Sequence, residues 1–243
     1  MGVFAAFVVL MALTASNERR LSDLRARSYE DWFLDFIGLF FQGIIIPILQ
    51  ITAVYQLYRY LLPISSGCLS VHPIAAVFIS FVFVDYVYYW NHRLLHSRWF
   101  WPLHMVHHTS TEMNVLSTSR NTLWTSFLIV YLWLHALFIY LLQDPTWYIA
   151  GVSLTSALDL WRHSAIAPTP KSLLYRLLSV LLILPQDHAW HHATASDRAN
   201  YGANLKLWDK LHGTYYKCEN APNSLGIKTD FSLIQKLVWP YRF

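Results

Sequence analysis

Long apolar runs constrain the fold of this chain more than any other feature. Residues 33–57, 73–90 and 123–142 contain at most one charged side chain each. About 20 helical residues cross a hydrocarbon core of roughly 30 Å, and a backbone inside a membrane has to bond to itself. The chain is 55% hydrophobic and 13% charged, with a mean hydropathy of +0.32, whereas soluble domains are about a quarter charged. We therefore expect an all-α integral membrane protein.

The order of these runs predicts transmembrane helical hairpins. Residues 33–57 and 73–90 form one hairpin, and residues 123–142 pair with the shorter run 147–160. All histidine groups then lie on the side where the hairpins begin and end. Of the 18 Lys and Arg residues, only Arg59 lies near an opposite turn, and short basic loops stay in the cytoplasm. We predict a histidine-rich helical cap that faces the cytosol, at the endoplasmic reticulum or a bacterial inner membrane.

Two shorter apolar stretches complete the domain organisation. Residues 3–15 are expected to form a short anchor, because a cleaved signal peptide would export the arginines between residues 19 and 27. Residues 173–184 are too short to span and suit an interfacial or re-entrant helix. We expect an N-terminal anchor and amphipathic segment over residues 1–32 and a single membrane-embedded domain over residues 33–243.

Composition and missing motifs exclude several function classes. The sequence has no Walker loop and no G-x-G-x-x-G, so nucleotide chemistry would have to come from a partner. The net charge of +4 is scattered near the predicted membrane boundaries, which favours lipid head groups over nucleic acid. Cys68 and Cys218 are the only cysteines and form no metal motif. A metalloprotease would need H-E-x-x-H, which is absent.

Nine of the 12 histidines form four closely spaced groups. Two groups read H-x2-H-H, and on a helix such residues share a face, so each motif is expected to aim three imidazoles at one point. Neutral imidazole is a common ligand of iron, zinc and copper. One metal ion takes about four to six ligands, so nine histidines predict a dinuclear site. The groups are His92 and His96; His104, His107 and His108; His163; and His188, His191 and His192.

Two helices are expected to carry part of this site. The helix over residues 73–90 should continue to His96, which puts Asp85 on the face of His92. Asp85 is then a candidate acceptor for a ligand's second ring nitrogen, or a structural acceptor between helices. Pro185 should start a second helix that carries the last histidine group. Residues 200–202, 208–209 and 213–215 are interpreted as turn and packing residues of the cap.

The motifs together resemble the fatty acid hydroxylase superfamily, which includes sterol desaturases and lipid hydroxylases. The similarity covers about residues 80–216 and includes DYVYYWNHR at 85–93, PLHMVHH at 102–108, HAWHH at 188–192, NYG at 200–202 and WDKLHGTY at 208–215. It implies a membrane-embedded di-iron centre that uses O2 to oxidise lipids, with zinc as a possible substitute metal. It implies that the nine grouped histidines are the ligands, and adds Asn114 to Asp85 and Asp159 as candidate catalytic residues.

Asp159 departs from the pattern of this superfamily. Some relatives carry a second histidine four residues before the one that matches His163, and this chain has Asp159 there. A carboxylate can bind iron, and i, i+4 spacing points Asp159 and His163 the same way. Asp159 is therefore either a metal ligand or an acceptor behind His163.

The resemblance implies hydroxylation of a fatty acyl, sterol or glycerolipid substrate with O2 and external electrons. Desaturation at the same site is the nearest alternative, and a membrane metal-binding protein without turnover is another. No haem or nucleotide motif is present, so electrons would come from a separate cytochrome, ferredoxin or pterin. We expect a basic surface to dock an acidic donor; its candidate residues are Arg93, Arg98, Arg120, Lys206 and Lys210.

Overall fold

A computed structural model describes residues 2–194, 199–218 and 220–241, and these residues form helices without a β-strand. Three isolated bridges join loops. The helices are α1 Gly2–Ala15, α2 Glu18–Ala26, α3 Tyr29–Phe40, η1 Phe41–Ile45, α4 Ile46–Leu49, η2 Gln50–Val54, α5 Tyr55–Leu61, α6 Pro73–Phe78, η3 Ile79–Phe83, α7 Val84–Leu95, α8 Trp101–His104, η4 His107–Thr109, η5 Val115–Ser119, α9 Thr125–Leu128, α10 Val130–Leu141, α11 Thr146–Arg162, α12 Leu173–Leu178, α13 Pro185–His191, α14 Leu207–Leu211 and α15 Leu233–Val238.

Two continuous helices are long and apolar enough to cross a membrane. Tyr29–Leu61 runs from α3 through α5, and Pro73–Leu95 runs from α6 through α7. Both begin at a side-chain cap, because Ser28 accepts from the backbone of Asp31 and His72 accepts from that of Ile74. These helices confirm the runs 33–57 and 73–90, and the second continues past residue 90 as predicted.

The predicted continuous helix over residues 123–142 is wrong. Ile129 has an extended backbone with ψ of 125°, and it separates the four-residue α9 from the 12-residue α10. Asn91 of α7 stabilises this break, because its side chain donates to the carbonyl of Leu128 at 3.0 Å and accepts from the N–H of Val130 at 3.2 Å. The break leaves these two partly buried backbone groups without a partner in the helix, and Asn91 satisfies both of them. The helix predicted over residues 173–184 is also shorter, since α12 ends at Leu178.

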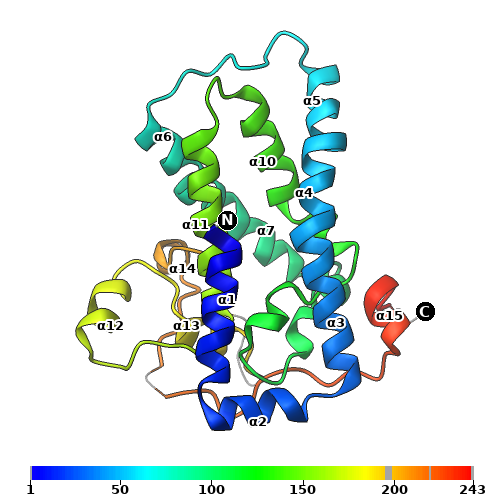
Figure 1. Cartoon of the computed structure of the whole chain (residues 1–243), viewed down its shortest axis with the longest axis vertical. Coiled ribbons are helices and arrows are strands. Elements are labelled where there is room, and N and C mark those ends of the chain that lie inside the picture. The colour runs from blue at the N-terminus through cyan, green and yellow to red at the C-terminus, as the bar shows by residue number, and fades with distance from the viewer. Residues whose placement is uncertain (1, 195–198, 219, 242–243) are drawn as a thin grey trace.

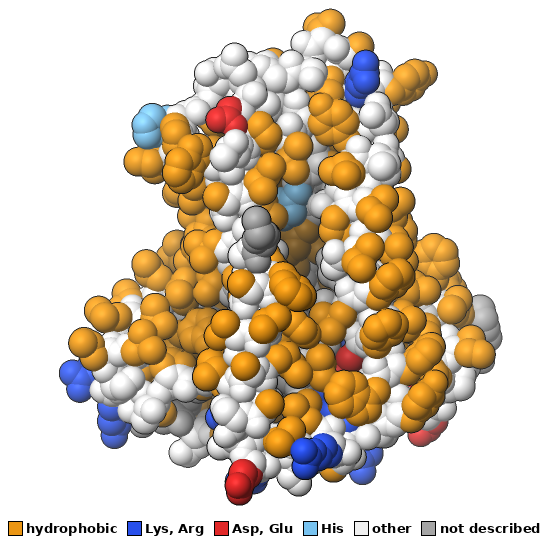
Figure 2. Space-filling view, in the orientation of Figure 1, with side chains coloured by type: hydrophobic (Ala, Val, Ile, Leu, Met, Phe, Trp, Pro, Cys, Tyr) orange, Lys and Arg blue, Asp and Glu red, His pale blue; other side chains and the backbone are white. Residues whose placement is uncertain are grey.

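The molecule is narrow in its upper part and broader in its lower part (Figure 1). In Figure 1 the helix from α3 to α5 runs along one side, α10 lies beside its upper half, and α12, α13 and α15 lie at the lower end. α11 packs against both α1 and α6. Figure 2 shows hydrophobic side chains over the middle of this face, with Lys and Arg mostly at the lower end. Ile44, Ile48 and Ile51 are 49–61% exposed, which suits contact with lipid chains.

Gly38 allows α3 to lie directly against η5. A Cβ added to Gly38 would lie 2.7 Å from the carbonyl carbon of Ser119 and 3.1 Å from the backbone nitrogen of Arg120. A side chain can change its rotamer to relieve a clash, but a backbone cannot. Gly43, one turn further along the same long helix, has open space around its own Cβ position.

We expect Gly38→Ala to destabilise the protein by about 2 kcal/mol, because the added methyl group forces α3 away from η5. The apparent melting temperature in detergent should fall by roughly 5 °C. Gly43→Ala is the matched control and should leave the melting temperature unchanged or raise it. Equal melting temperatures for the two variants would contradict the close approach at Gly38.

Candidate metal centre

The nine grouped histidines come from four separate parts of the chain and converge in the lower half of the molecule. Each is buried, with at most 6% of its surface exposed. They lie on or at the ends of five helices whose order in the chain does not predict that the histidines come together. His92 and His96 belong to the end of α7, His104 to α8, His107 and His108 to η4, His163 to the end of α11, and His188, His191 and His192 to α13 and its C-cap.

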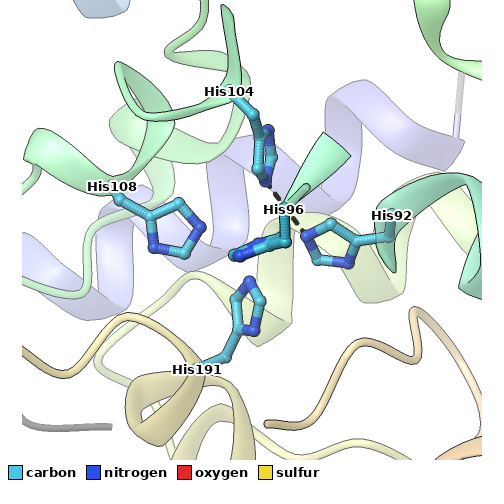
Figure 3. Close-up of side chains that lie close together, drawn as sticks. All are labelled: His92, His96, His104, His108 and His191. Atoms are coloured by element: carbon cyan, nitrogen blue, oxygen red, sulfur yellow. Dashed lines mark hydrogen bonds between the residues drawn. The ribbon is translucent and has the colours of Figure 1, made fainter. Parts of the chain in front are cut away.

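The structure divides these histidines into two groups. Within each group the potential ligand atoms lie within 4.8 Å of one another. Figure 3 shows the rings of the larger group, which converge from different elements on one region. The larger group contains His92, His96, His104, His108 and His191, and the smaller contains His107, His163, His188 and His192.

The H-x2-H-H motifs do not aim three imidazoles at one point, so that prediction is wrong. His104 and His108 belong to the larger group, but His107 belongs to the smaller. The first of these motifs is also not one helix, because α8 ends at His104 and η4 begins at His107. In the second motif His188 and His192 share a group while His191 points to the other. Each motif therefore joins both groups.

Ring nitrogens in the smaller group approach one another closely. The Nε2 atom of His163 is 3.1 Å from that of His107 and 2.9 Å from that of His188, and the Nε2 atoms of His188 and His192 are 3.1 Å apart. Metal–imidazole bonds of about 2.1 Å that meet at about 90° would place two ligand nitrogens about 3.0 Å apart. The spacing of these nitrogens therefore matches a shared metal ion.

The other ring nitrogens show where the protons lie. The Nδ1 atom of His107 is 3.1 Å from the carbonyl of Arg120, and that of His163 is 2.8 Å from the carbonyl of Asp159. A carbonyl only accepts, so both Nδ1 atoms carry a proton, and in the neutral form of each ring the Nε2 atom carries a lone pair. Two facing lone pairs 3.1 Å apart cannot form a hydrogen bond, whereas a cation between them would satisfy both. His92 and His191 donate in the same way to the carbonyls of Tyr201 and Ala199.

Burial lowers the pKa of six of the grouped histidines and so favours their neutral form. Burial, with a smaller contribution from neighbouring His191, lowers the pKa of His104 to about 3. Burial also lowers the pKa of His191 to about 4. The same cause holds the pKa values of His107, His108, His188 and His192 well below the ordinary value, and neighbouring histidines add to the effect. Neutral imidazole is the form that binds a metal ion.

The hydrogen bonds that the structure gives Asp85 go to the cap and not to a histidine. Its carboxylate accepts from the backbone N–H groups of Asn204 at 2.8 Å and Leu205 at 3.1 Å, and from the indole of Trp208 at 2.7 Å. Of the two sequence interpretations, this geometry favours the structural acceptor. Asp85 ties α7 to the segment whose Tyr201 carbonyl holds His92.

Asp159 and Asn114 occupy different positions around the centre. One carboxylate oxygen of Asp159 lies 3.2 Å from Nδ1 of His163, on the side of the ring that faces away from the cluster, and also pairs with Arg162. This position favours the acceptor behind His163. Asn114 caps η5, where its side chain accepts from Leu116 at 2.9 Å. A catalytic role for either residue stays a prediction.

A buried charge network behind His107 was missed by sequence analysis. Arg120 donates to Asp35 at 2.6 Å and to Asp31 at 2.8 Å, and Arg27 also pairs with Asp35. The carbonyl of Arg120 is the group that accepts from His107. The spacing of Asp31 and Asp35 one turn apart on α3 was the available signal, but their partner lies 85 residues away from Asp35.

Two residues of the predicted donor-docking surface are buried, so that part of the prediction is wrong. Arg120 is 1% exposed and Lys206 is 2% exposed. Lys206 pairs with Asp187 at 2.8 Å, just as Arg120 pairs with the carboxylates of α3. Buried charges persist because such partners neutralise them. Arg98 and Lys210 are exposed and Arg93 is half-buried.

Two cavities with shared lining residues lie near the histidine groups, and the inner one is lined by some of them. An inner cavity of about 60 Å³ is lined by His92, His104, His107, His163 and His188 among other residues. An outer cavity of about 610 Å³ extends between α1, α3, α10 and α11. The two share six lining residues: Gln42, Thr118, Ser119, Tyr131, Asp159 and Arg162.

Comparisons with known proteins give a family and several relatives. The family model described as fatty acid hydroxylase matches residues 77–214. Human alkylglycerol monooxygenase is 28% identical over 143 residues, which is 56% of this chain and 29% of that protein. The ornithine lipid hydroxylase OlsE of Rhizobium tropici is 29% identical over 145 residues, 58% of this chain and 41% of that protein. The chain thus spans less than half the length of these relatives, and no solved structure matches it.

We expect His107→Ala to lower the metal content from about two ions per chain to about one or fewer, because it removes a ligand of the four-histidine group. His135→Ala is the control, since His135 lies outside both groups and bonds to the hydroxyl of Tyr148 at 2.9 Å. Elemental analysis of the purified proteins measures both. Loss of metal from the His135 variant would contradict the assignment of the groups.

We expect the metal-free protein to lose stability as the pH falls below about 6.5. Unfolded histidines bind protons there, whereas buried His104 and His191 stay neutral down to pKa values of about 3 and about 4. As the pH falls, the unfolded chain therefore binds protons that the folded chain cannot bind. Above about pH 7 these histidines are neutral in both states, so they no longer make the free energy of unfolding depend on pH. Melting temperatures after chelation, measured from about pH 5 to about pH 8, test the expectation. Equal values at both ends would contradict it.

Proposed function

This chain belongs to the fatty acid hydroxylase family, and from this premise we propose that it is a membrane di-iron oxygenase that hydroxylates a lipid. The observation that carries the proposal is that two buried groups of histidines lie at an inner cavity, which shares lining residues with a large, mainly apolar cavity. The printed names of the relatives, alkylglycerol monooxygenase and ornithine lipid hydroxylase, support insertion of oxygen into a lipid.

The donor set suits two iron ions. Nine imidazoles without a carboxylate in either group give a neutral ligand set, which favours late transition metals over magnesium or calcium. Two irons would supply the activation of O2 that breaking an unreactive C–H bond requires, which no side chain can supply. Zinc binds to the same ligand type and is a possible substitute.

The protein's own contribution is to hold the ligands and the substrate in place. The carbonyls of Tyr201, Arg120, Asp159 and Ala199 fix the orientation of four imidazoles. The outer cavity of about 610 Å³ falls in the size range of small-ligand sites. Phe4, Phe7 and Leu160 give it apolar walls that would bind a hydrocarbon chain and exclude water from the reaction.

The surface supports a membrane location. Besides the two long apolar helices, Leu173, Leu177 and Leu181 around α12 are 57–72% exposed. Basic residues gather at the lower end of the molecule (Figure 2), and the predominance of Lys and Arg on the histidine side places that side in the cytosol in our proposal. The lower half would then lie at the membrane surface, with the cavity open toward the lipid.

Electrons would come from a separate cytochrome, ferredoxin or pterin. Arg98 and Lys210 are exposed on the histidine-bearing half and, with half-buried Arg93, remain candidates to dock an acidic donor. Surface charges of this kind accelerate association more than they strengthen it.

The test is a lipid screen with the iron-loaded protein. We expect protein purified in mild detergent under low oxygen to contain about two irons per chain. With O2 and a chemical reductant, it should convert a lipid to a product heavier by one oxygen atom in mass spectra. His188→Ala, which removes a predicted ligand, is the inactive control.

Two outcomes would contradict the proposed reaction. A product that only loses two hydrogens would replace hydroxylation by desaturation at the same site. No lipid product from iron-loaded, reduced protein across fatty acyl, sterol and glycerolipid substrates would favour a metal-binding protein without turnover.

A further inference from the structure

The passage between the two cavities is polar, whereas much of the outer cavity is apolar. All six residues that line both cavities have polar side chains: Gln42, Thr118, Ser119, Tyr131, Asp159 and Arg162. The outer cavity alone is lined by Val3, Phe4, Phe7, Leu39, Pro47 and Leu160 among others. A lipid that fills both cavities would therefore place a polar group beside the histidines and its hydrocarbon chain toward α1 and α3.

Asp159 has an unused acceptor in this passage. Its Oδ1 atom contacts Arg162 and His163, while the structure gives Oδ2 no hydrogen-bond partner among the described residues. The Asp159 side chain is 36% exposed although α11 packs between α1 and α6. Since Asp159 lines both cavities, this exposure faces their junction.

Two residues that line the same passage, Arg162 and Tyr131, each have a buried donor without a partner. The side chain of Arg162 is 5% exposed, and its guanidinium donates to Asp159 and to the carbonyl of Ala203, yet its Nε–H has no partner. The hydroxyl of Tyr131 is also buried without a partner. A buried donor that stays unsatisfied costs about 1–3 kcal/mol, so a ligand that satisfies it gains affinity.

We propose that Asp159 and Arg162 bind a hydroxyl group of the lipid, so that oxidation takes place within the first few carbons of that hydroxyl. A hydroxyl donates one hydrogen bond and accepts others, which matches the free carboxylate oxygen of Asp159 and the free donors of Arg162 and Tyr131. A phosphodiester or a carboxylate has no proton to donate at neutral pH and would face the charge of Asp159. This inference rests on the proposed function, and it assigns to Asp159 a specificity-determining role.

A matched pair of ligands tests the inference by binding alone. The probes are 1-hexadecanol and its methyl ether, which keeps the acceptor oxygen and lacks the donor. The wild-type chain in detergent should bind the alcohol about tenfold more tightly, which is typical of a hydrogen bond to a charged group. Asp159→Asn should reduce this preference to about twofold or less. Asp23→Asn, the same change at an exposed carboxylate, should keep it.

The outcomes separate this inference from the proposed function. Equal affinity of the wild type for the two ligands, or a full preference in the Asp159 variant, would overturn the inference. In the wild type alone, the position of the inserted oxygen is a second readout: oxygen near the hydroxyl supports the inference, and oxygen near the methyl end overturns it. A chain that prefers the alcohol but converts no lipid would support the hydroxyl site and contradict the proposed reaction.

Discussion

The burial of nine imidazoles in one place is the constraint on which the rest of the structure depends. Each ring has two nitrogens, and a buried nitrogen without a partner costs free energy. Four rings satisfy Nδ1 by donating to backbone carbonyls, which turns their Nε2 lone pairs toward the cluster. Facing lone pairs such as those of His107 and His163 then need a cation. The arrangement therefore suits a metal-binding site better than an ordinary core.

Buried carboxylates that belong to neither histidine group hold those carbonyls in place. Asp85 holds residues 204–208 against α7, and Asp35 holds Arg120, whose carbonyl orients His107. Asp209 accepts from the backbone of Tyr201 and Gly202 at 2.8 Å and so supports the carbonyl that orients His92. The acidic residues thus act through the loops, while the histidines supply the ligand atoms.

The helix break at Ile129 connects the hydrogen bonds around the histidines to the two cavities. In an uninterrupted helix over residues 123–142, the backbone N–H and C=O groups would form hydrogen bonds with one another. Because Asn91 bonds to both sides of the break, the chain turns at Ile129, and Ile129 lines the inner cavity while Tyr131 lines both cavities. A single amide on α7, one residue before His92, therefore links the histidine groups to the wall of both cavities.

The sequence by itself determined the helical class, the two long apolar helices and the nine histidines that converge, because apolar runs and closely spaced ligands are local patterns. It also carried the family motifs from Asp85 to Tyr215. Only the tertiary structure decided how the histidines divide, since His107 and His191 each leave the neighbours of their own motif for the other group. It likewise decided that Arg120 and Lys206 are buried and that Asp159 faces a cavity, because burial depends on partners far away in the chain. Spacing along one helix predicts which side chains share a face, but the elements packed against that face determine what each side chain meets.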